Sequence, residues 1–467
     1  MSVTTDQMIA WCRAILGADG SARLSLDEQL KAIPRLSSLA DVPAGTVVLV
    51  RGDVDCKPGA EIGEGDVRLR SMLATLKIGQ QKGWKQVIFG HIGRKPEGSL
   101  NKVCARLSAL LGTPVEFVAD WFDESSLTIK PDLTAALSKL SNGGILLLEN
   151  TRKYAIERVL WKAKPDDLPK LAGDLAKYAN EIATKIGSIY VNEALSAGSL
   201  DSSTVVAPVG MKKAVLGDYV AGEFDGPMRR CLDTELVVFS GLKIDKLDDL
   251  QAMIDRDKIR IVFAAGSLAM ALKKAAVELD GGKFSLGVAE DPAQSDKPFY
   301  IPPERIEQAR AMIAKGRKEG IEFVLPVDFV LADGSVATTL KPGDQQFDVG
   351  PATSELFAKK VGEFISAVKT RPAGMPPAVA FHNGVFGMFE DPKFEKGTKL
   401  FVGELKRMKD AGIEVYIGGG EGGTALERYG QPDWVTHCFT AGGTVLNALG
   451  SEPVPYLVAL ARLALQK

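Results

Sequence analysis

The sequence predicts an α/β protein with two Rossmann-like lobes, each a parallel sheet with helices on both faces, joined by a hinge helix. Short, uninterrupted apolar runs recur along the chain, which is typical of strands buried on both faces of a parallel sheet. Segments with helical spacing separate most of these runs, as crossover helices do. The runs are too many for one compact core, which favours two sheets. The expected strands are residues 46–50, 86–89, 144–148, 188–191, 236–239, 260–264, 322–326, 378–381 and 414–417.

The expected helices lie between these strands. An amphipathic stretch at 214–232 precedes a fresh strand, so we predict that it forms the helix joining the two lobes. The alternative is an ordinary crossover helix inside one large sheet. Residues 1–32 are expected to form a mixed, partly helical N-terminal extension. The other segments with helical spacing are 67–82, 99–111, 168–186, 303–319, 353–369, 398–409 and 424–428.

Composition narrows the class of protein. Hydrophobic residues make up 45% of the 467 residues and charged residues 25%, which excludes disordered and fibrous classes. The 57 Lys and Arg against 59 Asp and Glu give a net charge of −2, which argues against a broad surface for nucleic acid or anionic membrane. Five scattered cysteines without a CxxC pair argue against a disulfide framework or a cysteine zinc site. We expect a cytoplasmic protein with no targeting peptide and no membrane span.

Charged side chains follow three strands of the front half of the chain, and Arg68 stands at the start of a predicted helix after an acidic turn. In a parallel sheet, ligands bind beyond the carboxyl ends of the strands. An arginine guanidinium offers a fork of donors that matches a phosphate or a carboxylate. Each motif alone is also compatible with a solvated turn, but their convergence favours a phosphate or carboxylate pocket. The residues concerned are Asp53, Asp55, Arg68, His91, Arg94 and Arg152.

A glycine-rich segment at 418–423 follows the strand expected at 414–417 and precedes a helical segment. That order places bare backbone N–H groups where they can bind phosphate. Glu421 lies inside the segment and could hold Mg²⁺, which prefers carboxylate and phosphate oxygens. The segment is neither a Walker A loop nor a dinucleotide fingerprint, and a simple tight turn stays open as an alternative.

Two further loops of the back half have residues suited to a nucleotide. Lys243 and Lys246 follow the strand at 236–239 and could neutralise a triphosphate. Asn383 and Glu390 flank a glycine-containing loop after the strand at 378–381, which suits a nucleoside and its ribose. A charged surface turn and a structural loop are the alternatives.

Taken in order, these motifs resemble the phosphoglycerate kinase family from about residue 33 to the C-terminus. The segments that carry the resemblance include RGDVDCKP at 51–58, GHIGRKP at 90–96, LLENTR at 147–152, NGVFGMFE at 383–390 and GGGEG at 418–422. The resemblance implies a glycolytic phosphotransferase that moves a phosphoryl group between Mg-ATP or Mg-ADP and the carboxylate of 3-phosphoglycerate. A kinase for a different carboxylate and a non-catalytic nucleotide-binding paralogue stay open as alternatives.

The resemblance also implies roles for segments and residues. Residues 33–213 would form an acceptor-binding N-lobe, 233–445 a nucleotide-binding C-lobe, and 446–467 a tail that returns to the N-lobe. The six front-half residues above would bind the acceptor. The nucleotide would be bound by Lys243, Lys246, Asn383, Glu390, Gly418, Gly419, Gly420, Glu421 and Gly422, with Glu421 as the Mg²⁺ ligand. Catalytic roles would fall to Arg68, Lys243, Lys246, Gly419 and Gly420, and we expect small-molecule partners and a monomer.

One loop departs from the family pattern. The segment YVNE at 190–193 also resembles the family pattern. In the family, the loop after it carries a further phosphate-binding arginine, whereas residues 195–204 contain no His and no Arg. A charge-assisted contact of arginine with phosphate contributes about 1.5–3 kcal/mol, or roughly ten- to a hundredfold in affinity. We therefore expect the acceptor pocket to have lost positive charge at this point. The carboxylate acceptor is already ionised, so catalysis needs positioning and charge neutralisation rather than a general base, and it needs the two lobes to close.

Overall fold

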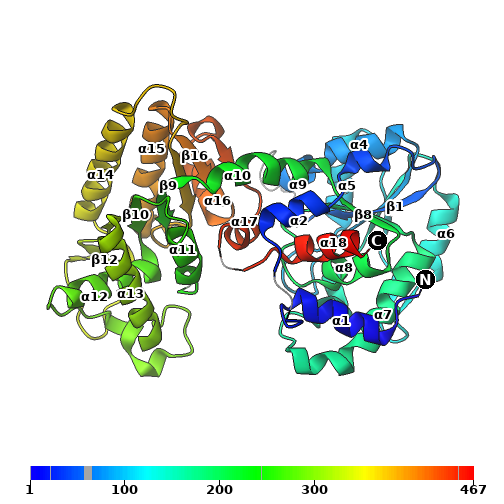
Figure 1. The fold of residues 1–467 in the computed structure, drawn as a ribbon, viewed down its shortest axis with the longest axis horizontal. Coiled ribbons are helices and arrows are strands. Elements are labelled where there is room, and N and C mark those ends of the chain that lie inside the picture. Colours follow the sequence, from blue (N-terminus) through cyan, green and yellow to red (C-terminus); the bar gives the residue numbers. More distant parts are fainter. Residues whose placement is uncertain (1, 21–22, 57–65, 243, 451, 467) are drawn as a thin grey trace. The chain divides into compact units, whose positions relative to one another are not determined.

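The computed structural model describes residues 2–20, 23–56, 66–242, 244–450 and 452–466. The chain folds into two compact units. Unit 1 comprises Met1–Asp225 and Pro453–Lys467, and unit 2 comprises Gly226–Glu452. Each unit has its own sheet and hydrophobic core, and each is described below by itself (Figure 1).

The main sheet of unit 1 has six strands in the order β3-β6-β2-β1-β7-β8, and all neighbouring pairs are parallel. The central strands are apolar and buried on both faces, as the uninterrupted runs of Val, Ile and Leu predict. A small antiparallel pair lies outside this sheet. The strands are β1 (Val47–Gly52), β2 (Lys85–Phe89), β3 (Glu116–Val118), β6 (Ile145–Leu148), β7 (Ile189–Glu193) and β8 (Lys213–Leu216), with the small pair β4 (Phe122–Asp123) and β5 (Thr128–Ile129).

The N-terminal extension forms two helices because each begins with a capping box, in which the first polar side chain and a residue three positions later satisfy each other's backbone N–H. The C-terminal helix packs against the second of them, although the two are far apart in sequence (Figure 1). The helices of unit 1 are α1 (Thr5–Ile15), α2 (Leu26–Ala32), α3 (Val67–Ser71), α4 (Leu73–Gln81), α5 (Asn101–Leu111), α6 (Pro131–Lys139), α7 (Leu168–Lys185), α8 (Ser202–Val205), α9 (Asp218–Glu223) and α18 (Pro455–Leu465).

The main sheet of unit 2 also has six parallel strands, in the order β11-β10-β9-β15-β16-β17. An antiparallel sheet in the order β13-β12-β14 accompanies it. The strands are β9 (Thr234–Phe239), β10 (Ile261–Ala264), β11 (Glu322–Val324), β15 (Val379–Asn383), β16 (Glu414–Ile417) and β17 (His437–Cys438), with β12 (Phe329–Leu331), β13 (Val336–Ala337) and β14 (Gln346–Val349) in the antiparallel sheet.

Buried carboxylates anchor two long helices of unit 2. Asp328 accepts the N–H groups of Ala352 and Thr353 at the start of α14, and Asp348 accepts the N–H of Gly397 at the start of α15. A carboxylate is favourable there because it satisfies free N–H groups and the positive end of the helix dipole. The helices are α10 (Arg229–Cys231), α11 (Lys246–Ile254), α12 (Gly266–Leu279), α13 (Pro303–Glu319), α14 (Pro351–Lys369), α15 (Lys396–Asp410), α16 (Glu421–Tyr429) and α17 (Gly442–Leu449).

The prediction of two parallel sheets with crossover helices is confirmed, and all nine expected strands are present. The prediction of one continuous helix over 214–232 is wrong at its start, since 214–216 belong to β8 and pair with β7. After β8 the chain forms α9, a π-helical turn at Phe224–Met228 and the short α10. Pro227 lies inside the π turn, where its missing N–H breaks the regular α-helical ladder. The π turn contains the boundary between the two units.

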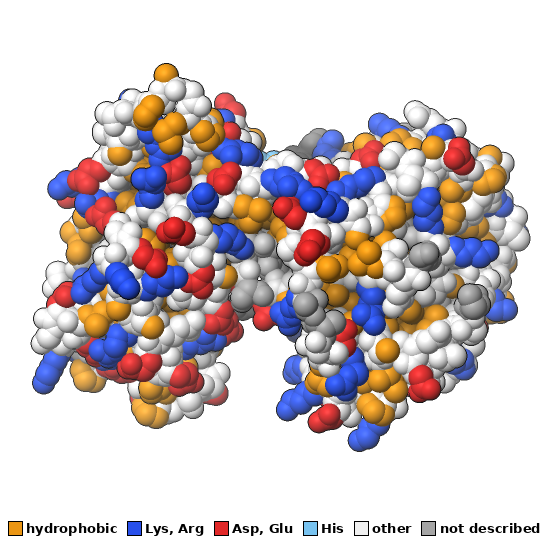
Figure 2. Space-filling view, in the orientation of Figure 1, with side chains coloured by type: hydrophobic (Ala, Val, Ile, Leu, Met, Phe, Trp, Pro, Cys, Tyr) orange, Lys and Arg blue, Asp and Glu red, His pale blue; other side chains and the backbone are white. Residues whose placement is uncertain are grey.

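Acidic and basic side chains are interspersed over the visible face of each unit (Figure 2). Across the described residues, each helix falls short of the length or the apolar character that a membrane crossing needs.

Candidate active site

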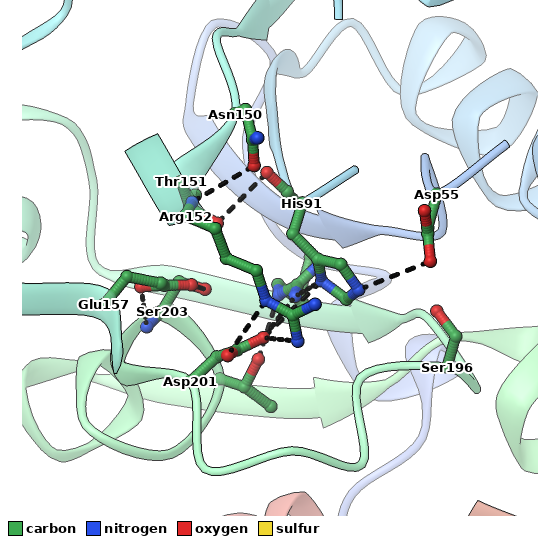
Figure 3. Close-up of polar contacts among 12 residues, drawn as sticks. Asp55, His91, Asn150, Thr151, Arg152, Glu157, Ser196, Asp201 and Ser203 are labelled. Carbon is green, nitrogen blue, oxygen red and sulfur yellow. Dashed lines mark hydrogen bonds and ion pairs between the residues drawn. The ribbon is translucent and has the colours of Figure 1, made fainter. Parts of the chain in front are cut away.

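The carboxyl ends of β1, β2, β6 and β7 supply the loops of a charged cluster in unit 1 (Figure 3). Two of these loops are joined by backbone and amide contacts. Thr151 donates its N–H to the carbonyl of Gly90 at 2.9 Å, and Asn150 donates to the carbonyl of Gly98 at 2.9 Å. The side chain of Asn150 also accepts the N–H of Arg152 at 3.1 Å. These bonds set the direction in which the loop after β6 presents its arginine.

Two aspartates after β1 hold Arg68 at the start of α3. The Arg68 Nη1 donates to the Asp55 carboxylate at 2.9 Å and to its carbonyl at 2.7 Å, while Nε lies 3.8 Å from the Asp53 carboxylate. Asp53 is buried and also accepts the Ser196 hydroxyl at 2.6 Å. Burial raises the pKa of Asp53, and the positive charge of Arg68 opposes that rise. Arg68 is therefore already paired with carboxylates in unit 1.

His91 is neutral and has a defined tautomer. Its Nδ1 lies 2.7 Å from the Arg51 Nη2, and because a guanidinium can only donate, Nδ1 accepts and the proton sits on Nε2. That Nε2 faces the Asp55 carboxylate at 3.7 Å. Burial, with the positive charges of Arg51, Arg152 and Arg68, holds the pKa of His91 well below its usual range. The imidazole thus contributes a hydrogen-bond donor but no charge.

Arg152 is buried and makes a fork on a carboxylate that sequence reasoning did not select. Its Nη2 donates to Asp201 at 2.9 Å and its Nε to the other oxygen at 3.3 Å (Figure 3). The indole N–H of Trp161 donates to the same carboxylate at 2.8 Å, and the Arg152 guanidinium lies 4.7 Å from the centre of the Trp161 ring. Arg51 approaches Asp201 at 3.5 Å.

The structure therefore brings five of the six predicted acceptor residues into one connected cluster: Asp53, Asp55, Arg68, His91 and Arg152. Arg94 is exposed, and none of the described hydrogen bonds or ion pairs of this cluster involves it. Sequence reasoning missed Asp201, Trp161 and Ser196. A signal was present for Asp201, because an acidic residue stands in the loop that lacks the family's arginine.

The carboxyl edge of the unit 2 sheet is built mainly from backbone. Gly419 and Gly420 have φ of +75° and +58°, and both precede the first turn of α16. A Cβ on Gly419 would overlap the carbonyl oxygen of Phe439. Within the described part of the chain, the N–H groups of Gly419 and Gly420 donate no hydrogen bond, so they are available to an anion at the positive end of the α16 dipole.

Neighbouring strands complete this edge. Gly384, with φ of +97°, follows β15, and a Cβ there would overlap the carbonyl oxygen of Ser240 after β9. The Lys246 ammonium donates to that same carbonyl at 2.6 Å, which places it beside the glycine turn. Asn383 is buried at the end of β15, and Gly418 packs directly over its side-chain amide. Lys243 lies outside the described residues.

The remaining predicted nucleotide residues lie on or near α16. Glu421 and Gly422 open the helix, and the Glu421 side chain is exposed. Glu390 is exposed. Burial and a hydrogen bond to Glu395 raise the pKa of Tyr429, on the last turn of α16, to about 12, and the negative charge of Glu390 adds to that rise. Among the described residues, no three His, Cys, Asp or Glu side chains gather as a metal-binding group. A single carboxylate still fits Mg²⁺ that takes its other oxygen ligands from phosphates and water.

Comparison with known proteins agrees with this fold. The family model described as Phosphoglycerate kinase matches residues 39–452. A Rippkaea orientalis protein named Phosphoglycerate kinase is 30% identical, over 92% of this chain and 98% of its own length. A Triticum aestivum protein named "Phosphoglycerate kinase, cytosolic" is 28% identical, over 89% of this chain and 95% of its own length.

Solved structures give the same result for the fold. Phosphoglycerate kinase from Pyrococcus horikoshii has a TM-score of 0.68 at 24% identity, and the match covers 93% of this chain and 100% of that one. The enzyme from Coxiella burnetii has a TM-score of 0.64 at 22% identity, covering 92% and 100%. Because the family model spans most of the chain and relatives match it over nearly their full length, this chain belongs to the phosphoglycerate kinase family.

Proposed function

We propose that this protein moves a phosphoryl group between ATP or ADP, bound with Mg²⁺, and the carboxylate of 3-phosphoglycerate, with 1,3-bisphosphoglycerate as the phosphorylated acid. Family membership over residues 39–452 supports this activity, and so do the names of the relatives. The observation that carries the proposal is a pair of different groups of anion-binding donors at the carboxyl edges of two parallel sheets. One is built from guanidinium groups and the other from glycine N–H groups.

The acceptor site suits an acid that needs no activation. A carboxylate is ionised at neutral pH, so its oxygen attacks phosphorus without a general base. The neutral His91 is consistent with a binding role, because its Nε2–H can donate a hydrogen bond while the imidazole does not take up a further proton near neutral pH. Arg68 would orient the carboxylate and stabilise the charge that develops on the transferring group.

The nucleotide site would act through backbone groups and lysines. The N–H groups of Gly419 and Gly420 would bind phosphate oxygens at the start of α16. Lys243 and Lys246 would offset negative charge on the phosphates as it builds up. Asn383 and Glu390 would contact the nucleoside and its ribose. Gly418 and Gly422 would allow the phosphates to approach the backbone.

Mg²⁺ fits this site through one carboxylate. Glu421 stands exposed at the first position of α16, next to the glycine N–H groups that would bind phosphates. When bound, the ion neutralises phosphate charge as a Lewis acid. The Glu421 carboxylate would keep the ion next to the phosphates that the glycine N–H groups would bind.

The residues assigned to the acceptor and to the nucleotide belong to different units, so transfer would require the units to close. The π turn at Phe224–Met228 is the leading hinge candidate, since Pro227 weakens its hydrogen-bond ladder. We also infer small-molecule partners, a monomer and a cytoplasmic location, the last in line with the name of the Triticum aestivum relative.

The test is a coupled assay of ADP formation with Mg-ATP and 3-phosphoglycerate, followed by a panel of other carboxylates. Turnover with 3-phosphoglycerate is expected. Turnover only with another acid would instead identify a sister kinase. Tight ATP binding without turnover on any acid would leave a non-catalytic paralogue.

A further inference from the structure

Asp201 is the carboxylate at the centre of the acceptor cluster. It stands at the N-cap of α8, in the loop that follows β7, and its side chain is fully buried. Arg152 donates its Nε and Nη2 to this carboxylate (Figure 3). The indole N–H of Trp161 donates to it at 2.8 Å, and the Nη2 of Arg51 donates to it at 3.5 Å. A buried carboxylate with a bidentate arginine is one of the stronger polar contacts in a protein. Asp201 therefore occupies Arg152 in the way that a bound anion would.

Arg152 has no nitrogen left without an internal partner. Besides the fork on Asp201, its Nη1 donates to the carbonyl of Gly93 at 2.7 Å. The guanidinium lies over the Trp161 ring, and the Arg152 side chain is only 5% exposed. An anionic ligand that uses this arginine must share it with Asp201 or displace Asp201 from it.

The charges of the cluster also balance. His91 is neutral, so the charged members of the cluster are guanidinium groups and aspartates. Each guanidinium lies within 4 Å of at least one of these carboxylates, and the formal sum is zero. The three cations are Arg51, Arg68 and Arg152, and the three anions are Asp53, Asp55 and Asp201. A phosphate that enters this cluster as a dianion therefore meets no net positive charge from these six groups.

We propose that Asp201 is a specificity-determining residue, which lowers the affinity of the acceptor site for the phosphate of a phosphorylated acid. The inference rests on the proposed function. It predicts that the site distinguishes poorly between 3-phosphoglycerate and glycerate, which is the same acid without the phosphate. Removal of the Asp201 charge frees the guanidinium of Arg152 for the phosphate.

The experiment measures binding of both acids to the whole protein by calorimetry, and steady-state kinetics with each acid. In Asp201→Asn, the affinity for 3-phosphoglycerate rises about tenfold or more, as expected for one freed charge-assisted contact. The affinity for glycerate and the KM for ATP stay within about twofold, and the effect appears in the KM for 3-phosphoglycerate rather than in kcat. Asp201→Ala removes the same charge without an amide and shows the same direction.

The matched control is Glu157→Gln. Glu157 is another buried carboxylate of unit 1, bonded to Ser203 rather than to an arginine, and burial raises its pKa to about 7. In Glu157→Gln, the ratio of the affinity for 3-phosphoglycerate to the affinity for glycerate stays as it is in the wild-type protein.

A purely structural role of Asp201 gives the opposite result. If Asp201 only orients Arg152, both variants bind 3-phosphoglycerate more weakly, and the proposal is overturned. Where neither variant folds, the wild-type protein decides: a preference for 3-phosphoglycerate over glycerate below about tenfold supports the inference, and one above about a hundredfold contradicts it. The binding data need no turnover, so a failure of the proposed kinase activity is distinguished from a failure of this inference.

Discussion

The two candidate anion sites occupy the same place in two parallel sheets but are built differently. The site of unit 1 consists of long charged side chains, and its buried arginine Arg152 already has a carboxylate partner. The site of unit 2 consists mainly of glycine backbone at the start of a helix, with Lys246 beside the neighbouring glycine turn. A site built from side chains can change its ligand when one residue changes charge. A site built from backbone N–H groups keeps its ligand class through most substitutions and loses binding only where a new Cβ would overlap neighbouring backbone.

The largest expected effect tests the side-chain site. Arg68→Ala should lower kcat/KM for the acid about 10²–10³-fold, as loss of a transition-state donor does, and leave the KM for ATP unchanged. Arg70→Ala is the control, because Arg70 is half exposed and paired with Asp66 rather than with Asp53 or Asp55. Melting curves first show that both variants fold. Steady-state kinetics with varied acid concentration at saturating ATP then give kcat/KM for Arg68→Ala and Arg70→Ala. A loss of less than tenfold for Arg68→Ala would remove its catalytic role.

The backbone site is tested by adding one methyl group. Gly419→Ala should weaken ATP and ADP binding about a hundredfold, because the new Cβ would overlap the carbonyl of Phe439 at a residue whose φ is +75°. Gly443→Ala on α17 meets no atom within 4 Å and should bind nucleotide normally. Nucleotide titrations by calorimetry distinguish the two variants. Equal affinities would show that the glycine segment does not bind phosphate.

A smaller effect is expected when Glu421, the one carboxylate assigned to the backbone site, is replaced. Glu421→Gln should lower activity about 10–100-fold and raise the Mg²⁺ concentration needed for half-maximal rate, because an amide is a weaker ligand than a carboxylate. The control is Glu355→Gln, an exposed glutamate on α14. Initial rates over a Mg²⁺ series provide the measurement. Identical Mg²⁺ curves for the two variants would exclude Glu421 as a ligand.

The smallest effect concerns the pH dependence of unit 1. Glu193, at the end of β7, accepts the Thr75 hydroxyl at 2.6 Å and the N–H of Tyr219, and burial raises its pKa from 4.5 to about 7. Between these pH values the folded state keeps a proton that the unfolded state has lost. The contribution of Glu193 to stability is therefore full at acidic pH and is lost as pH rises through about 7.

Glu193→Gln should remove this dependence, because an amide resembles the protonated acid and does not titrate. The free energy of unfolding of the wild-type protein should fall by about 1–3 kcal/mol more than that of the variant between pH 5 and pH 8. Urea unfolding at several pH values measures this difference, with the exposed Glu116→Gln of β3 as control. Parallel curves for wild type and Glu193→Gln would contradict the prediction.

Much of the fold could be predicted from local pattern. The uninterrupted apolar runs identified every central strand of both main sheets, since a strand buried on both faces has to be apolar throughout. The edge strands β3 and β17 were missed because they are only three and two residues long and are partly exposed. The strand β8 was predicted as the start of a helix because α9 begins only two residues after it ends.

The candidate site of unit 1 likewise has residues that local pattern predicted and residues that it did not. The position of polar residues after strands selected Asp53, Asp55, His91 and Arg152, because parallel strands bring their carboxyl ends to one edge. Arg68 was selected by its place at the start of a helix. No local pattern could show that Asp201 faces Arg152, since 49 residues separate the two and their contact depends on how the loop after β7 folds back.

The sequence by itself determined the class of fold, the two sheets and the residue types available to bind anions. These follow from periodicity and from the position of polar residues relative to strands. Only the tertiary structure decided which charges are free and which are already neutralised. The pairing of charges depends on distances between side chains that are remote along the chain, and over such distances a local pattern has no influence.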